Sequence, residues 1–128
     1  MSPMASNLLL ALLTILFIPI YAYSAESTNP LRIKNGEYIF QHKFAEHPHI
    51  DSIHFIVKIQ GNHIVVSNIE NSEVFPKGLI EEGTLMFHKK TQGWIISTSP
   101  KDINAKEVGG CSDGPTVVDL INKIYWSC

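Results

Sequence analysis

IHFIVKIQGNHIVVSNI, residues 53–69, is the stretch of sequence that decides the fold. Apolar and polar side chains alternate on both sides of a central Gly-Asn dipeptide, which is typical of a two-residue type II′ turn. Pairing across this turn sets Ile59 opposite Ile64. Two positions further from the turn, it sets Val57 opposite Val66. The register and the apolar pattern therefore agree, and the segment predicts a β-hairpin with one buried face.

Three further segments predict strands on either side of this hairpin. Residues 37–44 (EYIFQHKF) alternate, with Tyr38, Phe40 and Phe44 on one side and His42 among them. Residues 79–90 and 94–99 predict a second hairpin around Thr91-Gln92-Gly93, whose glycine can adopt a positive φ.

The segment after Cys111 has a different pattern. Thr116 stands three residues before Asp119 in a capping-box arrangement, and apolar residues then recur at helical spacing. We expect a short helix from about Pro115 to Lys123, followed by an extended Tyr125-Trp126. A strand is the alternative, because the apolar residues of this segment are mostly β-branched.

These elements predict an α+β fold that is mainly antiparallel β. We expect a meander sheet of four or more strands, a short C-terminal helix and one disulfide. With 128 residues, the chain fits one small β-rich domain over residues 25–128, preceded by a signal peptide at 1–24.

Composition excludes several classes of protein. A formal net charge of −2 argues against nucleic-acid binding, which usually needs a basic face. With 45% hydrophobic and only 17% charged residues, the chain is too apolar for a disordered protein. No spacing of cysteine and histidine matches a zinc finger.

The first 24 residues predict export. An apolar run from Leu8 to Ile20 has the length of a signal-peptide core, and Ala22-Tyr23-Ser24 supplies a small-residue cleavage site. No Lys or Arg precedes the run, so an uncleaved membrane anchor is the alternative. We expect a periplasmic or secreted protein that contacts the membrane only through this segment. In such an oxidising compartment Cys111 and Cys128, the only two cysteines, predict a disulfide rather than a catalytic thiolate.

Histidines suggest a metal site. Four of them fall within 13 positions, and the candidate ligands are His47, His49, Asp51 and His54, with His42 close by in sequence. Neutral imidazole suits zinc and copper, so an exported cluster of this kind can bind either ion. The alternative is a set of surface histidines that bind no metal, and we expect the protein to have no cofactor.

Catalytic motifs are weak. Gly110–Gly114 (GCSDG) matches the G-x-S-x-G nucleophile pattern, but no histidine follows Ser112 and the chain is too small for an α/β-hydrolase. Glu81 and Glu82 are adjacent on a predicted strand, so they point to opposite faces and cannot act together on one substrate.

We therefore expect a small exported binding protein without catalytic activity, whose partner is another exported or cell-envelope protein. Lysozyme inhibitors and immunity proteins against cell-wall toxins are small exported β-rich proteins that act in this way; the analogy is one of fold class, not of motif. Tyr125 and Trp126 are candidate interface anchors, with packing against the sheet as the alternative. A zinc or copper binder acting through the His47/His49 loop is the second hypothesis.

Overall fold

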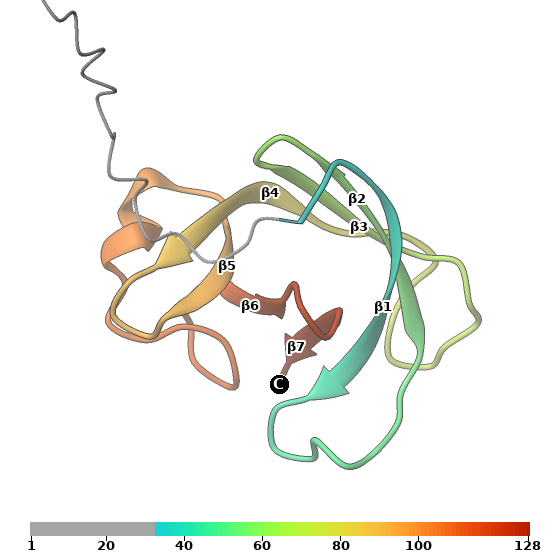
Figure 1. Cartoon of the computed structure of the whole chain (residues 1–128). Helices are drawn as coiled ribbons and strands as arrows, with labels where there is room; N and C mark the ends of the chain where they lie inside the picture. The colour runs from blue at the N-terminus through green and yellow to red at the C-terminus, as the bar shows by residue number, and fades with distance from the viewer. Residues whose placement is uncertain (1–32) are drawn as a thin grey trace, which may run out of the picture.

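The computed structural model describes residues 33–128, which form a single β-barrel (Figure 1). Its strands are β1 (Gly36–Phe44), β2 (His54–Gln60), β3 (His63–Asn68), β4 (Gly78–His88), β5 (Gly93–Ser97), β6 (Thr116–Asp119) and β7 (Ile124–Ser127). A 3-10 helix, η1 (Pro100–Asn104), lies between β5 and β6. The predicted export leader and its cleavage site lie outside the described residues.

Strands follow one another around the barrel in chain order, and each pairs antiparallel with the next. The barrel closes where β1 and β7 pair in parallel, with Gln41 opposite Ile124 and Phe44 opposite Ser127. We call this pairing the closing seam. The predicted antiparallel meander is therefore confirmed, but it closes on itself instead of ending in two free edges.

Both predicted hairpins are present. In the first, Ile59 pairs with Ile64 and Val57 with Val66. Gly61 has φ of 60° at the first central position of the turn, as a type II′ turn requires. In the second hairpin, Leu85 pairs with Ile96 and Phe87 with Trp94. Here Gln92, and not the adjacent glycine, takes the positive φ, at 56°.

The predicted helix over residues 115–123 is wrong. Thr116–Asp119 form strand β6, because β5 offers an edge against which the β-branched residues can pair. The Asp119 carboxylate then accepts hydrogen bonds from the backbone N–H groups of Ile121 (3.0 Å) and Asn122 (2.8 Å), which turns the chain back. Burial raises the pKa of Asp119, but these hydrogen bonds outweigh it and hold the pKa below its usual value. Within residues 33–128 the only helix is the 3-10 turn η1.

Side chains fill the inside of the barrel. Alternate residues of each strand point inward, and the apolar ones with no exposed surface are Phe40, Phe55, Val57, Ile64 and Val66. Backbones also approach closely, since a Cβ added at Gly83 would lie 2.5 Å from the Ser97 carbonyl oxygen. The barrel is thus a packed core and offers no open lumen to a ligand. Among the elements of residues 33–128, no helix is long and apolar enough to cross a membrane.

Candidate functional site

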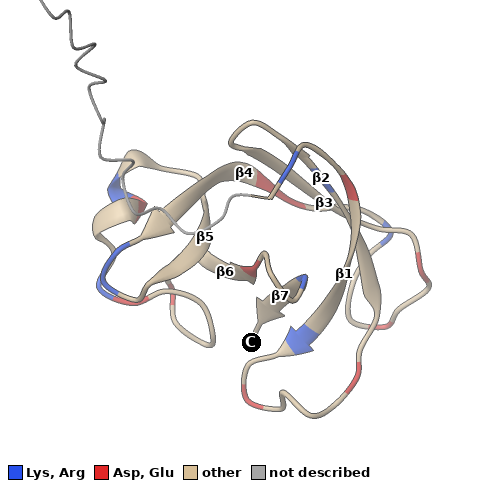
Figure 2. Cartoon of the chain, in the orientation of Figure 1, with Lys and Arg blue, Asp and Glu red and all other residues tan. Residues whose placement is uncertain are grey.

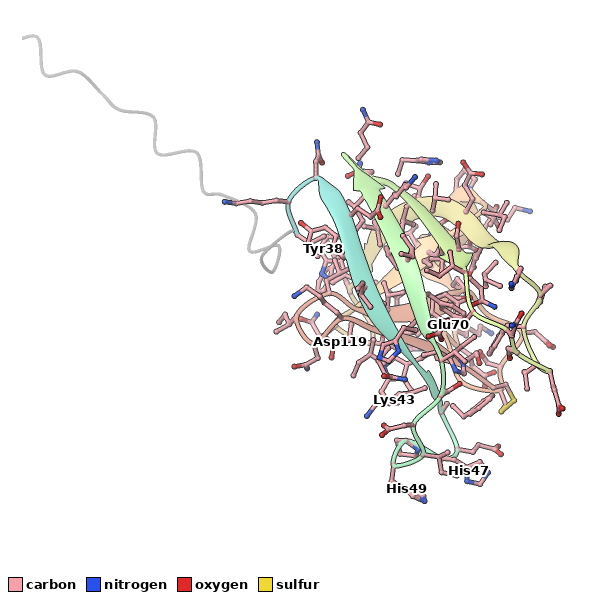
Figure 3. The ribbon with its side chains drawn as sticks, turned by 90° about the vertical axis from the view of Figure 1, so that its right-hand side faces the viewer. Tyr38, Lys43, His47, His49, Glu70 and Asp119 are labelled. Atoms are coloured by element: carbon pink, nitrogen blue, oxygen red, sulfur yellow. A yellow bond between two sulfur atoms is a disulfide. The ribbon has the colours of Figure 1, made fainter. Side chains whose placement is uncertain are left out.

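An apolar hollow lies on the outer face of the barrel, across β1 and β2 and the residues that follow β3. Its volume is about 290 Å³, and its lining residues are Ile39, His54, Phe55, Ile56, Ile69 and Glu70. Figure 3 shows this side of the molecule, with β1 and β2 in front and Glu70 beside them. We call these six residues the apolar hollow.

The hollow exists because two strand positions break the usual pattern. Phe40 and Phe55 pair across β1 and β2 and point into the core, so their neighbours Ile39 and Ile56, also paired, point outward. Most outward positions of these strands carry polar side chains, yet Ile39 is 64% exposed. Ile69 adds a second exposed apolar side chain, at 66%. Isolated exposed apolar residues are ordinary, whereas here Ile39, Ile56 and Ile69 line one hollow, which makes it a candidate interaction surface.

One wall of the hollow is held by a buried asparagine. The Asn68 side chain is 1% exposed and donates hydrogen bonds to the carbonyl oxygens of Glu70 (3.0 Å), Phe75 (3.3 Å) and Pro76 (3.2 Å). The Glu70 carboxylate in turn accepts a hydrogen bond of 2.9 Å from the backbone N–H of His54 on β2. The segment after β3 therefore holds Ile69 and Glu70 in fixed positions against the barrel.

Charge is unevenly distributed around the molecule (Figure 2). The two loops near the hollow, residues 45–53 and 69–77, carry four carboxylates and one lysine: Glu46, Asp51, Glu70, Glu73 and Lys77. The β4–β5 turn and the segment around η1 carry four lysines and two carboxylates: Lys89, Lys90, Lys101, Lys106, Asp102 and Glu107. The outward faces of β1 and β2 add Glu37, Lys43 and Lys58, of which Lys58 and Glu37 pair at 3.9 Å. These strands and loops together carry five carboxylates against three lysines, so the hollow lies on the more acidic side of the barrel.

Inside the barrel, His42 lies at the closing seam. It is fully buried, and its Nε2 lies 2.6 Å from Ser127 Oγ on β7. The rings of Phe44 and Phe75 are each centred 4.6 Å from its own, and burial lowers its pKa. Nδ1 has no hydrogen-bond partner in the described part of the chain, so this Ser–His pair lacks the acid that orients the base in hydrolases.

A second interior polar contact joins β7 to β4. Tyr125 Oη donates a hydrogen bond of 2.6 Å to Glu81 Oε2, and Tyr125 is 5% exposed. Burial, together with the nearby Glu81 carboxylate, raises the pKa of Tyr125. Glu81 and Glu82 face opposite sides of β4, as expected, because they pair with the inward Val66 and the outward Val65.

The predicted metal ligands are only partly brought together. His47 and His49 lie on the exposed loop after β1, with ring centroids 6.5 Å apart (Figure 3). His54 instead lines the apolar hollow. No group of three or more His, Cys, Asp or Glu side chains among residues 33–128 is placed to hold one metal ion. The set of His47, His49, Asp51 and His54 stays a prediction.

The remaining candidates take structural positions. Cys111 and Cys128 form the predicted disulfide. Ser112 Oγ donates a 2.6 Å hydrogen bond to the Gly109 carbonyl oxygen, as expected of a turn residue. Of the predicted interface pair, Tyr125 points into the barrel and only the half-buried Trp126 reaches the surface.

No protein-family model, no curated protein and no solved structure matches this chain. Alternation within the two strands places Ile39 and Ile56 on the outward side, but alternation alone does not distinguish them as site residues. The signal was present, since both interrupt a series of polar outward positions.

Proposed function

We propose that this chain is a small exported, non-catalytic binding protein whose partner is another exported or cell-envelope protein. The observation that carries the proposal is the apolar hollow, in which Ile39 and Ile69 are each about two-thirds exposed. Apolar side chains gathered at the surface of a soluble domain are costly unless a partner covers them.

The packed interior favours a macromolecular partner over a small molecule. Barrels that carry small ligands hold them in the lumen, whereas here aromatic and aliphatic side chains occupy that space. Recognition is then left to the outer face and the loops. An inhibitor or an immunity-type protein is the specific form we propose, because such proteins act by covering a surface of their target.

Lysine-directed crosslinking tests this proposal without assuming which face binds. Lysines are distributed around the barrel, so a crosslinker applied to intact cells that make the chain samples most of its surface. We expect one dominant crosslinked partner, identified by mass spectrometry, which then forms a complex with the purified oxidised chain at a Kd below about 1 µM. Absence of any such complex, or turnover of a substrate by the purified chain, would overturn the proposal.

A zinc or copper binder is the second candidate, favoured by the neighbouring rings of His47 and His49 on one exposed loop. Titration of the purified chain with each metal ion, repeated with His47→Ala and His49→Ala, tests it. Equal affinity in the parent chain and the variants would remove this candidate.

A further inference from the structure

We infer that the apolar hollow receives a cationic segment of the partner, in which an apolar side chain is flanked by lysine or arginine. This inference rests on the proposed function and specifies the chemistry of the partner.

The hollow is built to accept an apolar side chain. Its walls are the outward isoleucines of two paired strands, together with Ile69, which the Asn68 hydrogen bonds hold in place. Because strands and a pinned loop form the walls, little ordering is needed on binding, and the burial of apolar surface is retained as affinity.

Glu70 supplies a charge at the edge of this hollow. Its Oε2 accepts the hydrogen bond from the His54 backbone, which orients the carboxylate. Its other oxygen, Oε1, accepts no hydrogen bond from the described residues and is free to accept one from a lysine or arginine. A charge-assisted bond of this kind is stronger and more directional than a neutral one.

The wider distribution of charge favours the same occupant. Around the hollow, β1, β2 and the two loops carry five carboxylates against three lysines, while the β4–β5 turn and the η1 segment carry four lysines against two carboxylates. A cationic segment is therefore attracted to the acidic side, which raises its association rate. A second copy of this chain related by a two-fold axis would bring its own acidic loops against these carboxylates, and an anionic lipid surface would also be repelled.

Site-specific photo-crosslinking tests the inference. A benzophenone amino acid replaces Ile39 or Ile69 in the full chain, in the cells that produce it. Ile121 and Ile103, which are 78% and 45% exposed and do not line the hollow, are the matched control positions. We expect crosslinks from positions 39 and 69 and none from 103 and 121, with the crosslinked peptide of the partner containing lysine or arginine beside an apolar residue.

Affinity measurements on the purified pair complete the test. Ile39→Ser and Ile69→Ser remove apolar surface from the centre of the contact, so each is expected to weaken binding about tenfold. Glu70→Gln keeps a hydrogen-bond acceptor for His54 but removes the charge; it is expected to weaken binding about threefold, and the effect should fade as salt rises. Ile121→Ser should leave the Kd unchanged. Equal thermal unfolding of the four variants shows that each retains the fold.

The outcomes separate this inference from the proposed function. A partner that crosslinks only from positions 103 or 121, or one with an acidic contact segment, would leave the binding function standing and overturn the inference. Crosslinks between two copies of the chain, or to lipid, would overturn the inference as well. Failure to crosslink from all four positions and through the lysines would overturn both.

Discussion

The two parts of the barrel wall are held together in different ways. From β1 to β5 the strands are five to eleven residues long, and each pairs with the next one along the chain. Residues 98–128 contain only two strands of four residues, a 3-10 turn and irregular chain. We call these parts the meander and the closing segment. The meander is maintained by contacts between sequence neighbours, whereas the closing segment depends on links to distant residues.

Two links join the closing segment to distant strands, and a third ties the segment to itself. The closing seam joins β7 to β1, a disulfide joins Cys111 to Cys128, and the Tyr125–Glu81 hydrogen bond joins β7 to β4. Each link can be weakened by substitutions that do not change the strand pairings of the meander. The predictions below remove or alter these links in order of expected effect.

Removing the disulfide should have the largest effect. The bond joins residues 17 positions apart in the sequence. Its loss raises the conformational entropy of the unfolded chain, which should lower the free energy of unfolding by about 3 kcal/mol. Urea unfolding of Cys111→Ser/Cys128→Ser against the oxidised parent measures this. Hydrogen exchange should show β6 and β7 losing protection while β2 and β3 keep theirs.

The matched control is the reduced parent chain, which should behave like the double variant. If β2 and β3 lose protection together with β7, the two parts unfold as one unit and the distinction between meander and closing segment is wrong.

Tyr125→Phe is expected to cost less, about 1–3 kcal/mol. It leaves the Glu81 carboxylate facing the interior without its hydrogen-bond donor. Adding Glu81→Gln to this variant removes the unpaired charge and should restore part of the loss, which a double-mutant cycle measures. A cycle in which the two losses simply add would show that the contact contributes nothing to closure.

The same division governs what the sequence predicts. In the meander, the alternation on both sides of Gly61 requires one register, because a shift by one residue would expose Val57 and Ile59. In the closing segment, the apolar residues fit a helical period as well as a strand. The strand forms because β5 and β1 offer pairing edges, which no local pattern records.

The candidate site divides in a similar way. The outward position of Ile39 and Ile56 follows from alternation alone. The approach of Ile69 and Glu70 depends on the three hydrogen bonds of Asn68, which cross a loop and have no periodic signal. The pairing of the disulfide was predictable for another reason, since a chain with two cysteines has a single intramolecular pairing.

Acid should weaken the closing seam through His42. Burial lowers the pKa of His42 below its usual value of 6.5, so the unfolded chain binds a proton that the folded chain does not. The free energy of unfolding is therefore expected to fall as the pH drops from 6.5 toward the lower pKa that His42 has in the folded chain. Above pH 6.5 the contribution of His42 is constant. The rings of Phe44, Phe55, Phe75 and Tyr125 surround the imidazole, and the Tyr125 hydroxyl donates its hydrogen bond to Glu81.

Urea unfolding at a series of pH values from 7.5 to about 4.5 measures this dependence, since the window must extend below the usual pKa of histidine. His42→Gln is the matched variant and should show a shallower slope between the two pKa values. A slope unchanged in that variant would show that the acid sensitivity does not arise from His42 at the seam.

Relief of backbone strain should give the smallest effect, and it compares the two parts directly. Lys123, between β6 and β7, and Gln92, between β4 and β5, both have φ of 56° in the left-handed region that favours glycine. Lys123→Gly should raise the free energy of unfolding by about 1 kcal/mol relative to Lys123→Ala, because both lose the side chain and only alanine keeps a strained Cβ. Gln92→Gly should raise the free energy of unfolding by less, since it also loses the 2.6 Å hydrogen bond from Gln92 Nε2 to the Lys89 carbonyl oxygen.

The last turn also contacts the closing seam, because the Lys123 carbonyl oxygen accepts a hydrogen bond from the Gln41 backbone N–H. Stabilisation by Lys123→Gly should therefore also slow hydrogen exchange of the Gln41 amide. If Lys123→Gly stabilises the chain without protecting that amide, the turn and the seam are independent, and closure of the barrel does not depend on the geometry of its last turn.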